Sequence, residues 1–257
     1  MLIDPTLDEV LAFCAQDPIE RVIIEDLARR GYARIRGVAD AQGLTGLCHF
    51  GANVVPSGSG CAELAVDDAL RGALMILGDE AAVDELWDAA RASMPEPRED
   101  RPRQPVFAIE EPPAGPDTGL RPARLDDLEL LLPACAASHL GELGTDPLER
   151  DPLGFRRRTA AQIQEGRSWV WLEDGTILFK AEAAAWTPRA IQLQQVWVDP
   201  EARERGYGTR GLAALCRLLL LRTPSVCLFV RQDNEPAIRL YERIGMRRAG
   251  TYRSILF

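Results

Sequence analysis

Lysine is almost absent from this sequence. Lys180 is the single lysine among 257 residues, so arginine supplies nearly all of the 30 basic side chains. Asp and Glu together number 39, which gives a formal net charge of −9. An acidic balance argues against non-specific binding to nucleic acid and is compatible with a cationic or amine-bearing substrate. We interpret the shortage of lysine itself as a bias of composition.

Paired cysteines and clustered histidines are also missing. The sequence has two histidines, too few and too isolated for a zinc site, so we expect no bound metal. No two of the six cysteines form a C-x-x-C pair, which favours reduced core residues over disulfides or metal ligands. These cysteines are Cys14, Cys48, Cys61, Cys135, Cys216 and Cys227.

Long hydrophobic runs are lacking as well. The longest aliphatic run, Leu218–Leu221, is far too short to span a bilayer. Acidic residues at positions 4, 8 and 9 contradict a secretory signal or a transit peptide. We therefore expect a cytoplasmic protein with no membrane partner.

The length of the chain and its prolines predict two domains. With 257 residues, the chain can form two cores, and seven of its 18 prolines lie between residues 94 and 118. The same segment carries the charge run Glu96–Arg103 and buries too little apolar surface to fold alone. We predict an N-terminal domain over residues 1–93, a connector with one embedded strand, Pro105–Ile109, over 94–118, and a C-terminal domain over 119–257.

The stretch Ile191–Thr209, IQLQQVWVDPEARERGYGT, has the most specific pattern. Apolar residues occupy alternate positions up to Leu193 and resume one position out of phase at Val196. A slip of one residue in a period of two predicts a β-bulge at Gln194–Gln195. The following Asp-Pro pair ends the strand, because proline cannot donate to a sheet.

A glycine loop follows the bulged strand. Gly206 and Gly208 stand on either side of Tyr207 and lead into a predicted helix over residues 209–222. Glycines at the start of a helix let the backbone approach a ligand, and the free N–H groups there suit a phosphate. Arginines at positions 203, 205 and 210 add positive charge.

Two motifs in the second half carry a resemblance. R-x-x-G-x-G at residues 203–208, preceded by V-x-V-x-P at 196–200, resembles the pyrophosphate-binding motif of the GNAT superfamily of acyl-CoA-dependent N-acyltransferases. N-x-x-A-x-x-x-Y-x-x-x-G at 234–245 is similar to the second signature of that family. Met246 stands where many members have phenylalanine. The resemblance covers about residues 119–257.

The resemblance implies acetyl-CoA as co-substrate and an amine as acceptor. The backbone of residues 205–209 would bind the pyrophosphate, and residues 196–198 would pair with the pantetheine arm. The cofactor-binding residues carried over in this way are Val196, Trp197, Val198, Arg203, Glu204, Arg205, Gly206, Tyr207, Gly208, Thr209, Asn234, Ala237 and Tyr241. The polar segment Asp146–Gly154 is expected to be a loop on the acceptor side.

Tyr241 and Glu182 are the candidate catalytic residues. A tyrosine holds a proton at neutral pH, so Tyr241 would protonate the departing thiolate. A buried aromatic at helical spacing is the structural alternative. Glu182 lies in a predicted strand, Thr176–Trp186, on the same face as Lys180, and would accept the amine proton directly or through water. An ion pair between these two side chains is equally compatible with the pattern.

The first half shows no GNAT motif, but its predicted elements follow the same order as those of the second half. We therefore expect a smaller, degenerate GNAT-like α/β domain there, whose Ser57–Gly60 stretch is a flexible loop. The fold expected for the chain is α/β with a mixed sheet, in which the GNAT fold of the second half has bulged, splayed central strands.

Three functions fit this interpretation. The favoured one is an acetyl-CoA-dependent N-acetyltransferase that moves the acyl group to a primary amine of a small molecule or peptide in a ternary complex. A non-catalytic acyl-CoA-binding regulatory module would share the phosphate loop and not depend on Tyr241 or Glu182. In a third interpretation the first half is a lid or a homodimerisation element. The identity of the amine is not encoded in any transferable motif.

Overall fold

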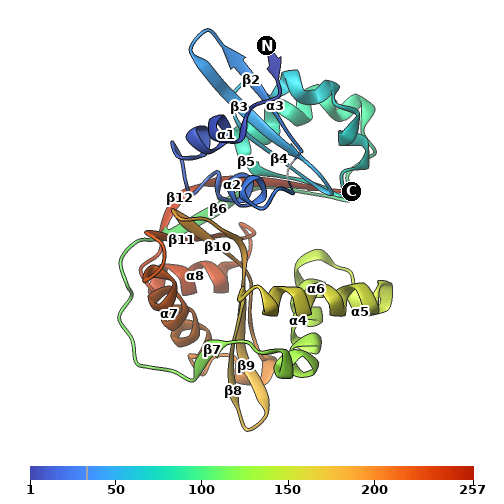
Figure 1. Ribbon diagram of the computed structural model, residues 1–257. Coiled ribbons are helices and arrows are strands. Elements are labelled where there is room, and N and C mark those ends of the chain that lie inside the picture. The colour runs from blue at the N-terminus through green and yellow to red at the C-terminus, as the bar shows by residue number, and fades with distance from the viewer. Residues whose placement is uncertain (33) are drawn as a thin grey trace.

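The structure is a computed structural model and describes residues 1–32 and 34–257. We call residues 1–118 the N-terminal half and residues 119–257 the C-terminal half (Figure 1). The N-terminal half contains β1 (Leu2–Ile3), α1 (Leu7–Cys14), α2 (Val22–Arg29), β2 (Arg34–Asp40), β3 (Gly43–Phe50), β4 (Asn53–Gly58), the 3-10 helices η1 (Cys61–Val66) and η2 (Asp68–Gly72), β5 (Met75–Asp79), α3 (Glu80–Ala90), η3 (Arg91–Ser93) and β6 (Glu99–Ile109).

The C-terminal half contains the longer helices and the glycine loop. Its elements are β7 (Leu120–Pro122), η4 (Leu125–Asp127), α4 (Leu128–Leu143), α5 (Pro147–Arg150), α6 (Pro152–Gln164), β8 (Ser168–Glu173), β9 (Thr176–Trp186), β10 (Ala190–Val198), η5 (Pro200–Ala202), α7 (Tyr207–Leu220), β11 (Ser225–Phe229), α8 (Glu235–Arg243) and β12 (Arg247–Leu256).

One sheet runs through both halves. Among the described residues it has 12 strands in the order β1-β2-β3-β4-β5-β12-β6-β11-β10-β9-β8-β7. Each half contains one parallel pair, β4 with β5 and β10 with β11, among antiparallel neighbours. Both halves therefore have the mixed sheet expected of a GNAT-like α/β unit, and the fold class predicted from the sequence is confirmed.

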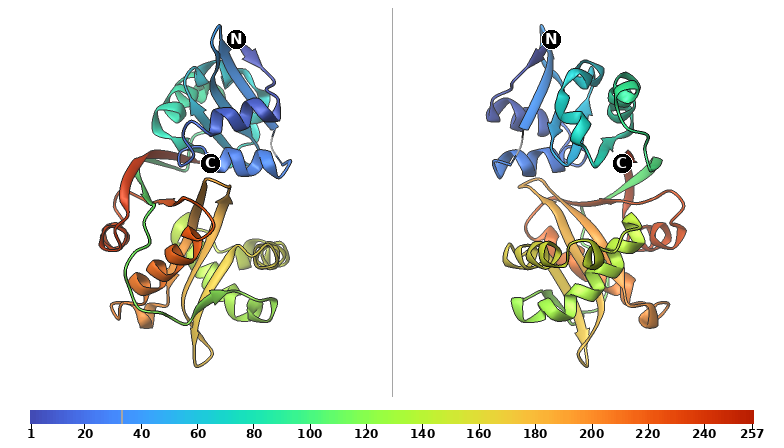
Figure 2. Two further views of the ribbon diagram at one scale, coloured as in Figure 1. Left: turned by 60° about the vertical axis from the view of Figure 1, so that its left-hand side comes forward. Right: turned by 90° about the vertical axis from the view of Figure 1, so that its right-hand side faces the viewer.

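The two halves exchange their last strands. β6 pairs with β11 of the C-terminal half, and β12 of the C-terminal half pairs with β5 of the N-terminal half. β6 and β12 also pair with each other over most of their length. The views in Figure 2 show β12 rising from the C-terminal half into the N-terminal half. The two sheets are thus continuous through this exchange.

Helix α2 and the residues just before it add contacts across the same junction. Asp26 is buried and pairs with Arg167 of the C-terminal half at 2.7 Å. Glu25 pairs with Arg189 at 3.2 Å, and the hydroxyl of Tyr252 donates to the carbonyl oxygen of Glu20 at 2.6 Å. These contacts add to the strand pairing that joins the two halves.

Two segments differ from the sequence-based expectations. The strand expected at Pro105–Ile109 is longer, because β6 begins at Glu99 and its charged residues pair with β12. The expectation of a loop over Asp146–Gly154 is wrong, since α5 and α6 occupy most of it. Asp146 and Asp151 cap these two helices, and a proline follows each cap.

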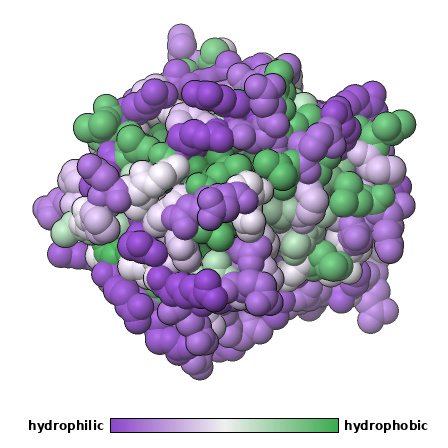
Figure 3. Space-filling view, turned by 90° about the horizontal axis from the view of Figure 1, so that it is seen from below, coloured by the Kyte–Doolittle hydropathy of each residue, from purple (hydrophilic) through white to green (hydrophobic). Residues whose placement is uncertain are grey.

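The surface seen from below belongs mainly to the C-terminal half. Figure 3 shows hydrophilic residues along the rim of this face and hydrophobic residues gathered between them. The exposed large hydrophobic residues of this half are Leu125, Leu130, Leu140, Leu153, Leu218 and Leu221. No helix in residues 1–32 and 34–257 is long and apolar enough to cross a membrane.

Candidate active site

A cleft of about 760 Å³ opens between the end of β10, the start of α7 and helix α8. We call it the α7 cleft. It is lined by Val196, Trp197, Val198, Ala202, Arg203, Glu204, Gly206, Tyr207, Gly208, Thr209, Asn234, Pro236, Ala237, Arg239, Leu240 and Arg243. The structure therefore brings together eleven of the thirteen residues that the resemblance assigned to the cofactor. Arg205 and Tyr241 do not line this cleft.

The start of α7 offers unsatisfied amide groups to this cleft. Its N-cap residue, Gly206, has φ 81°, and within the described chain no side chain caps the helix. Left-handed backbone at this position favours glycine. A Cβ on Gly208 would lie 2.8 Å from Leu240 Cδ1 and 3.2 Å from Val198 Cγ2, so a larger residue here would displace these side chains. Free N–H groups and the positive end of a 14-residue helix fit a diphosphate.

The predicted bulge in β10 is confirmed. The register between β9 and β10 shifts between Gln194 and Trp197, and Gln195 has φ 49°. The parallel pairing of β10 with β11 covers only Ala190–Gln192, so the two strands separate beyond this point. The other edge of Val196–Val198 is consequently free of β11 and can pair with an extended ligand.

Three arginines, Arg203, Arg239 and Arg243, line the α7 cleft. Arg203 was expected there, whereas Arg239 and Arg243 on α8 were not predicted. The cationic side chain of Arg210 lies 4.8 Å from the Tyr207 ring and 5.0 Å from the Trp171 ring. Spacing along α8 could have revealed Arg239 and Arg243, because residues four apart share a helix face.

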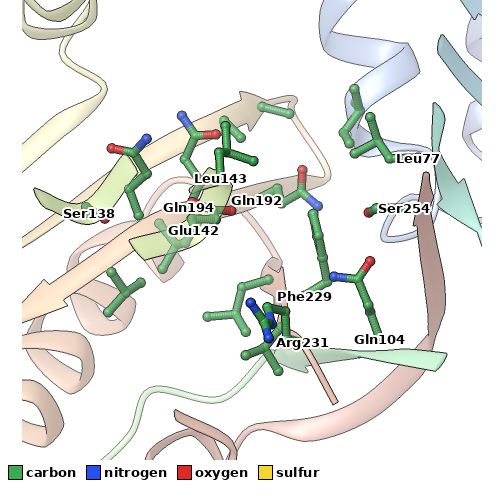
Figure 4. Close-up of a pocket in the computed structure, with 18 of the residues that line it drawn as sticks. Leu77, Gln104, Ser138, Glu142, Leu143, Gln192, Gln194, Phe229, Arg231 and Ser254 are labelled. Carbon is green, nitrogen blue, oxygen red and sulfur yellow. The ribbon is translucent and has the colours of Figure 1, made fainter. Parts of the chain in front are cut away.

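A second cavity, of about 740 Å³, lies where the two halves meet. We call it the central cavity (Figure 4). Its walls come from α2, β3, β4, β5 and β6 of the N-terminal half and from α4, β9, β10, β11, α8 and β12 of the C-terminal half. It shares Val196, Trp197, Arg203 and Asn234 with the α7 cleft, so the two spaces adjoin at the bulge.

Tyr241 lines the central cavity. Its side chain is 7% exposed and its ring packs against Phe107. Its hydroxyl has no hydrogen-bond partner in the part of the chain that the structure describes. Burial, with a smaller contribution from the charge of Glu142, raises the pKa of Tyr241 well above its ordinary value. The phenol therefore keeps its proton throughout the neutral pH range.

Glu182 lies behind the wall of the central cavity. Its Oε1 pairs with Lys180 Nζ at 2.5 Å, and its Oε2 lies 3.5 Å from Gln194 Nε2. The face shared by Lys180 and Glu182 is as expected, and the two side chains form an ion pair. Gln194 lines the cavity, whereas Glu182 does not. Gln194 therefore connects Glu182 to the cavity.

Lys180 is fully buried and ties this network to the bulge. Its Nζ lies 3.0 Å from Gln195 Oε1 and 3.3 Å from Cys135 Sγ. Burial opposes the charged form, but the Glu182 carboxylate and the other acceptors outweigh it and raise the pKa of Lys180. The single lysine of the chain is thus a charged group that supports the bulged residue from behind.

Glu142 was not predicted and lies in the central cavity. Its side chain is solvent-accessible and comes from the last turn of α4, as does Leu143, and Ser138 lies one turn earlier on the same helix (Figure 4). Desolvation by the nearby walls of the cavity raises the pKa of Glu142, and the positive charge of Arg101 opposes the shift. The sequence has no motif for this residue, because only the packing of α4 over β10 makes a cavity there.

Comparisons with known proteins agree with this arrangement. Residues 136–246 match the acetyltransferase (GNAT) family, and residues 33–131 match a domain of unknown function (DUF4081). The C-terminal half therefore contains a GNAT domain, as the motifs indicated.

Two named relatives are similar over part of the chain. A mycothiol acetyltransferase of Nocardioides sp. (strain ATCC BAA-499 / JS614) is 32% identical over 117 residues, which is 44% of this chain and 39% of the relative. A peptidyl-lysine N-acetyltransferase of Escherichia coli (strain K12) is 33% identical over 85 residues, which is 33% of this chain and 53% of the relative. The matches thus span about half or less of these relatives.

Solved structures resemble the whole fold. A GNAT-family acetyltransferase structure from Novosphingobium aromaticivorans DSM 12444 covers 93% of this chain and 97% of its own, with TM-score 0.58 and 20% identity. A tandem GNAT protein from the clavulanic acid biosynthesis pathway covers 96% and 92%, with TM-score 0.54 and 15% identity. The two-part GNAT architecture therefore occurs elsewhere.

Proposed function

We propose that the protein is an acetyl-CoA-dependent N-acetyltransferase whose acceptor is a primary amine. One observation carries this proposal: the α7 cleft, with its uncapped helix start, adjoins the central cavity at the bulge of β10. A CoA diphosphate at the start of α7 and an amine in the central cavity would approach each other across Val196 and Trp197. The wall between the two spaces is formed by these shared residues.

The chain supplies binding groups and proton carriers for this reaction. Acetyl-CoA would supply a thioester whose acetyl carbon is activated toward an amine. The amides at the start of α7 would hold the diphosphate, and the free edge of Val196–Val198 would position the pantetheine arm. Tyr241, which keeps its proton because of its raised pKa, would protonate the departing sulfur.

Two carboxylates are available for the proton that the amine loses. Glu182 would act through Gln194 and a water molecule, as its position behind the cavity wall requires. Glu142 faces the cavity directly, and its raised pKa brings it closer to the pKa range useful for a base at neutral pH. Separate Glu182→Gln and Glu142→Gln variants distinguish these two routes, since the base variant alone should shift the acid limb of the kcat/KM profile.

Thermal unfolding with and without saturating acetyl-CoA tests the proposal. Ligand at one hundred times its dissociation constant should add about 2.7 kcal/mol of stability. CoA should give a similar increase in Tm and ATP should not. Release of CoA thiol with a panel of amines then tests catalysis. An equal shift with ATP, or none with acetyl-CoA, would contradict the assignment of the α7 cleft.

The Lys180–Glu182 ion pair favours a second function, because it engages the carboxylate that the sequence analysis proposed as the general base. A non-catalytic acyl-CoA-binding regulatory module would keep the α7 cleft and need no free base. In this case acetyl-CoA would bind, no amine would release thiol, and Tyr241→Phe would change neither result. Turnover that depends on Tyr241 would exclude the regulatory module.

A further inference from the structure

Buried amide groups without protein partners line the central cavity. Gln104 and Gln192 are 2% and 1% exposed, and the Oε1 atom of each has no hydrogen-bond partner among the described residues. The Nδ1 atom of His49, which is 6% exposed, is unpartnered in the same sense. Buried polar groups are almost always hydrogen-bonded, so three unpartnered groups around one cavity mark a place where a polar ligand can bind.

These groups lie away from the CoA side of the cavity. In Figure 4, Gln194, Ser138 and Glu142 lie at one end, Gln192 lies between, and Gln104 and Ser254 lie at the other end near Leu77. The order follows from the fold, because Gln192 precedes the bulge along β10 whereas Gln104 belongs to the exchanged strand β6. A ligand that contacts all of them must extend from the bulge into the N-terminal half.

The nearby charged groups already have partners. Asp26 pairs with Arg167 at 2.7 Å, and Arg101 binds Glu99 and the carbonyl oxygen of Glu142. Burial lowers the pKa of His49, so its imidazole is neutral at pH 7. The free acceptor atoms at this end are therefore neutral, and the free donors include the Nε of Arg101, which has no partner among the described residues. Hydroxyl and amide groups can both donate to such acceptors and accept from such a donor.

We propose that His49, Gln104 and Gln192 form a recognition subsite for the neutral, hydroxyl- or amide-bearing end of a small acceptor amine. The N-terminal half thereby acts as the specificity element of the enzyme, because His49 and Gln104 both belong to it. This assignment rests on the proposed function only for the identity of the ligand as an acceptor. Apolar walls such as Val55, Leu77 and Phe229 would exclude water and strengthen each hydrogen bond.

Matched pairs of amines test this subsite on the full chain. Glucosamine is compared with cyclohexylamine, and serinamide with isobutylamine, so that each pair differs mainly in neutral polar groups. Affinity is measured by calorimetry with saturating CoA present, which requires no turnover. We expect the polar member of at least one pair to bind at least tenfold more tightly than its apolar partner.

Two variants locate the preference. Gln104→Leu and Gln192→Leu should each reduce the ratio of affinities for the polar and the apolar amine at least tenfold and leave the Kd for CoA unchanged. Gln164→Leu, an exposed glutamine on α6, is the matched control and should change neither. Loss of an unsatisfied buried amide should not lower Tm, so a retained or raised Tm separates recognition from a structural role. If one variant fails to fold, the other carries the test.

Each result decides between the alternatives. Apolar amines that bind as tightly as polar ones, absence of binding by both polar amines, or a preference that survives both leucine variants would overturn the subsite. A preference that is present without any thiol release would overturn catalysis and leave the subsite in place. If the unmodified protein does not bind CoA, the assignment of the α7 cleft is overturned.

Discussion

The two halves contain the same strand-turn-helix unit in two states. In the C-terminal half, β10 leads through Gly206 into α7, and in the N-terminal half β4 leads through Gly60 into η1. Both glycines are N-caps with φ 81°. The backbone plan is therefore shared, and the differences lie in what surrounds it.

The N-terminal unit is closed by its own side chains. The amide of Cys61, the first residue of η1, donates to the carboxylate of Glu85 at 2.8 Å. A Cβ on Gly78 would lie 2.8 Å from the carbonyl oxygen of Pro56, so β4 and β5 remain close where β10 and β11 separate. An internal carboxylate thus satisfies an amide at the position where the C-terminal half leaves its amides free.

Helices α3 and α8, which occupy corresponding places in the two halves, differ at one position that matters for the proposed reaction. Asp79 caps α3 and Asn234 caps α8, and each side chain accepts from the amide three residues later. Seven residues after the cap, α3 has the buried Leu86 and α8 has Tyr241. The shared scaffold thus keeps its capping residues in both halves, whereas the tyrosine that we propose as proton donor occurs in only one.

Removing residues 1–110 should have the largest effect on this comparison. The shortened chain lacks β6, which lies between β11 and β12, so both strands lose a partner. We expect no cooperative thermal transition by circular dichroism. A chain that starts at residue 95 restores β6 and should regain a transition. A folded, acetyl-CoA-binding chain without residues 1–110 would show that the halves are independent.

Tyr241→Phe should have the next largest effect. Loss of a general acid should lower kcat by about 10²-fold or more, while calorimetry should show an unchanged Kd for acetyl-CoA. Because burial raises the pKa of Tyr241, its acid form persists below that pKa, and kcat of the unmodified protein should not fall between pH 7 and 9 through its ionisation. The exposed Tyr32→Phe is the control. Equal kcat values for the two variants would indicate that Tyr241 is a core residue with no role as general acid.

Much of this contrast is readable in the sequence, and some of it is not. The bulge at Gln194–Gln195 and the glycine loop were predictable, because a phase slip and a glycine pair are local signals. The shared face of Lys180 and Glu182 followed from strand parity. The partners of β6 and β12 were not predictable, because alternation along a strand does not identify the strand beside it.

The central cavity was not predictable from the sequence for the same reason. Gln104, Gln192 and His49 lie on three strands that are distant in sequence, and Glu142 ends a helix. Each is an ordinary polar residue within its own element. Only when the two halves come together are these residues enclosed in one cavity, so their shared role depends on tertiary contacts.

Valine at each of the two N-cap glycines should give a smaller effect that differs between the halves. A left-handed backbone costs an L-residue about 1–2 kcal/mol, so Gly206→Val and Gly60→Val should both lower Tm. Gly206→Val alone should also weaken the binding of acetyl-CoA, because the loop would move to relieve its strain and take its amides away from the ligand. Each 1.4 kcal/mol of binding free energy lost in this way raises the Kd about tenfold. Equal affinities of both variants in calorimetry would contradict a ligand role for the start of α7.

Glu85→Ala should have the smallest effect. It removes one charge-assisted hydrogen bond to a helix start, which contributes about 1.5–3 kcal/mol. We expect a fall in Tm of several degrees and an unchanged Kd for acetyl-CoA. Asp88→Ala on the same helix, which loses only an exposed pair with Arg91, should change stability by less than about 1 kcal/mol. Similar losses in both variants would mean that Glu85 does not close the N-terminal unit.

The strand exchange also orders events during synthesis. The ribosome makes the N-terminal half first, yet the place between β5 and β6 stays empty until residues 247–256 emerge. Two long strand edges are exposed during that interval, when they are open to pairing with other chains. A strand of the later half therefore completes the sheet of the earlier half, and a nascent chain that stalls before β12 leaves both halves unfinished.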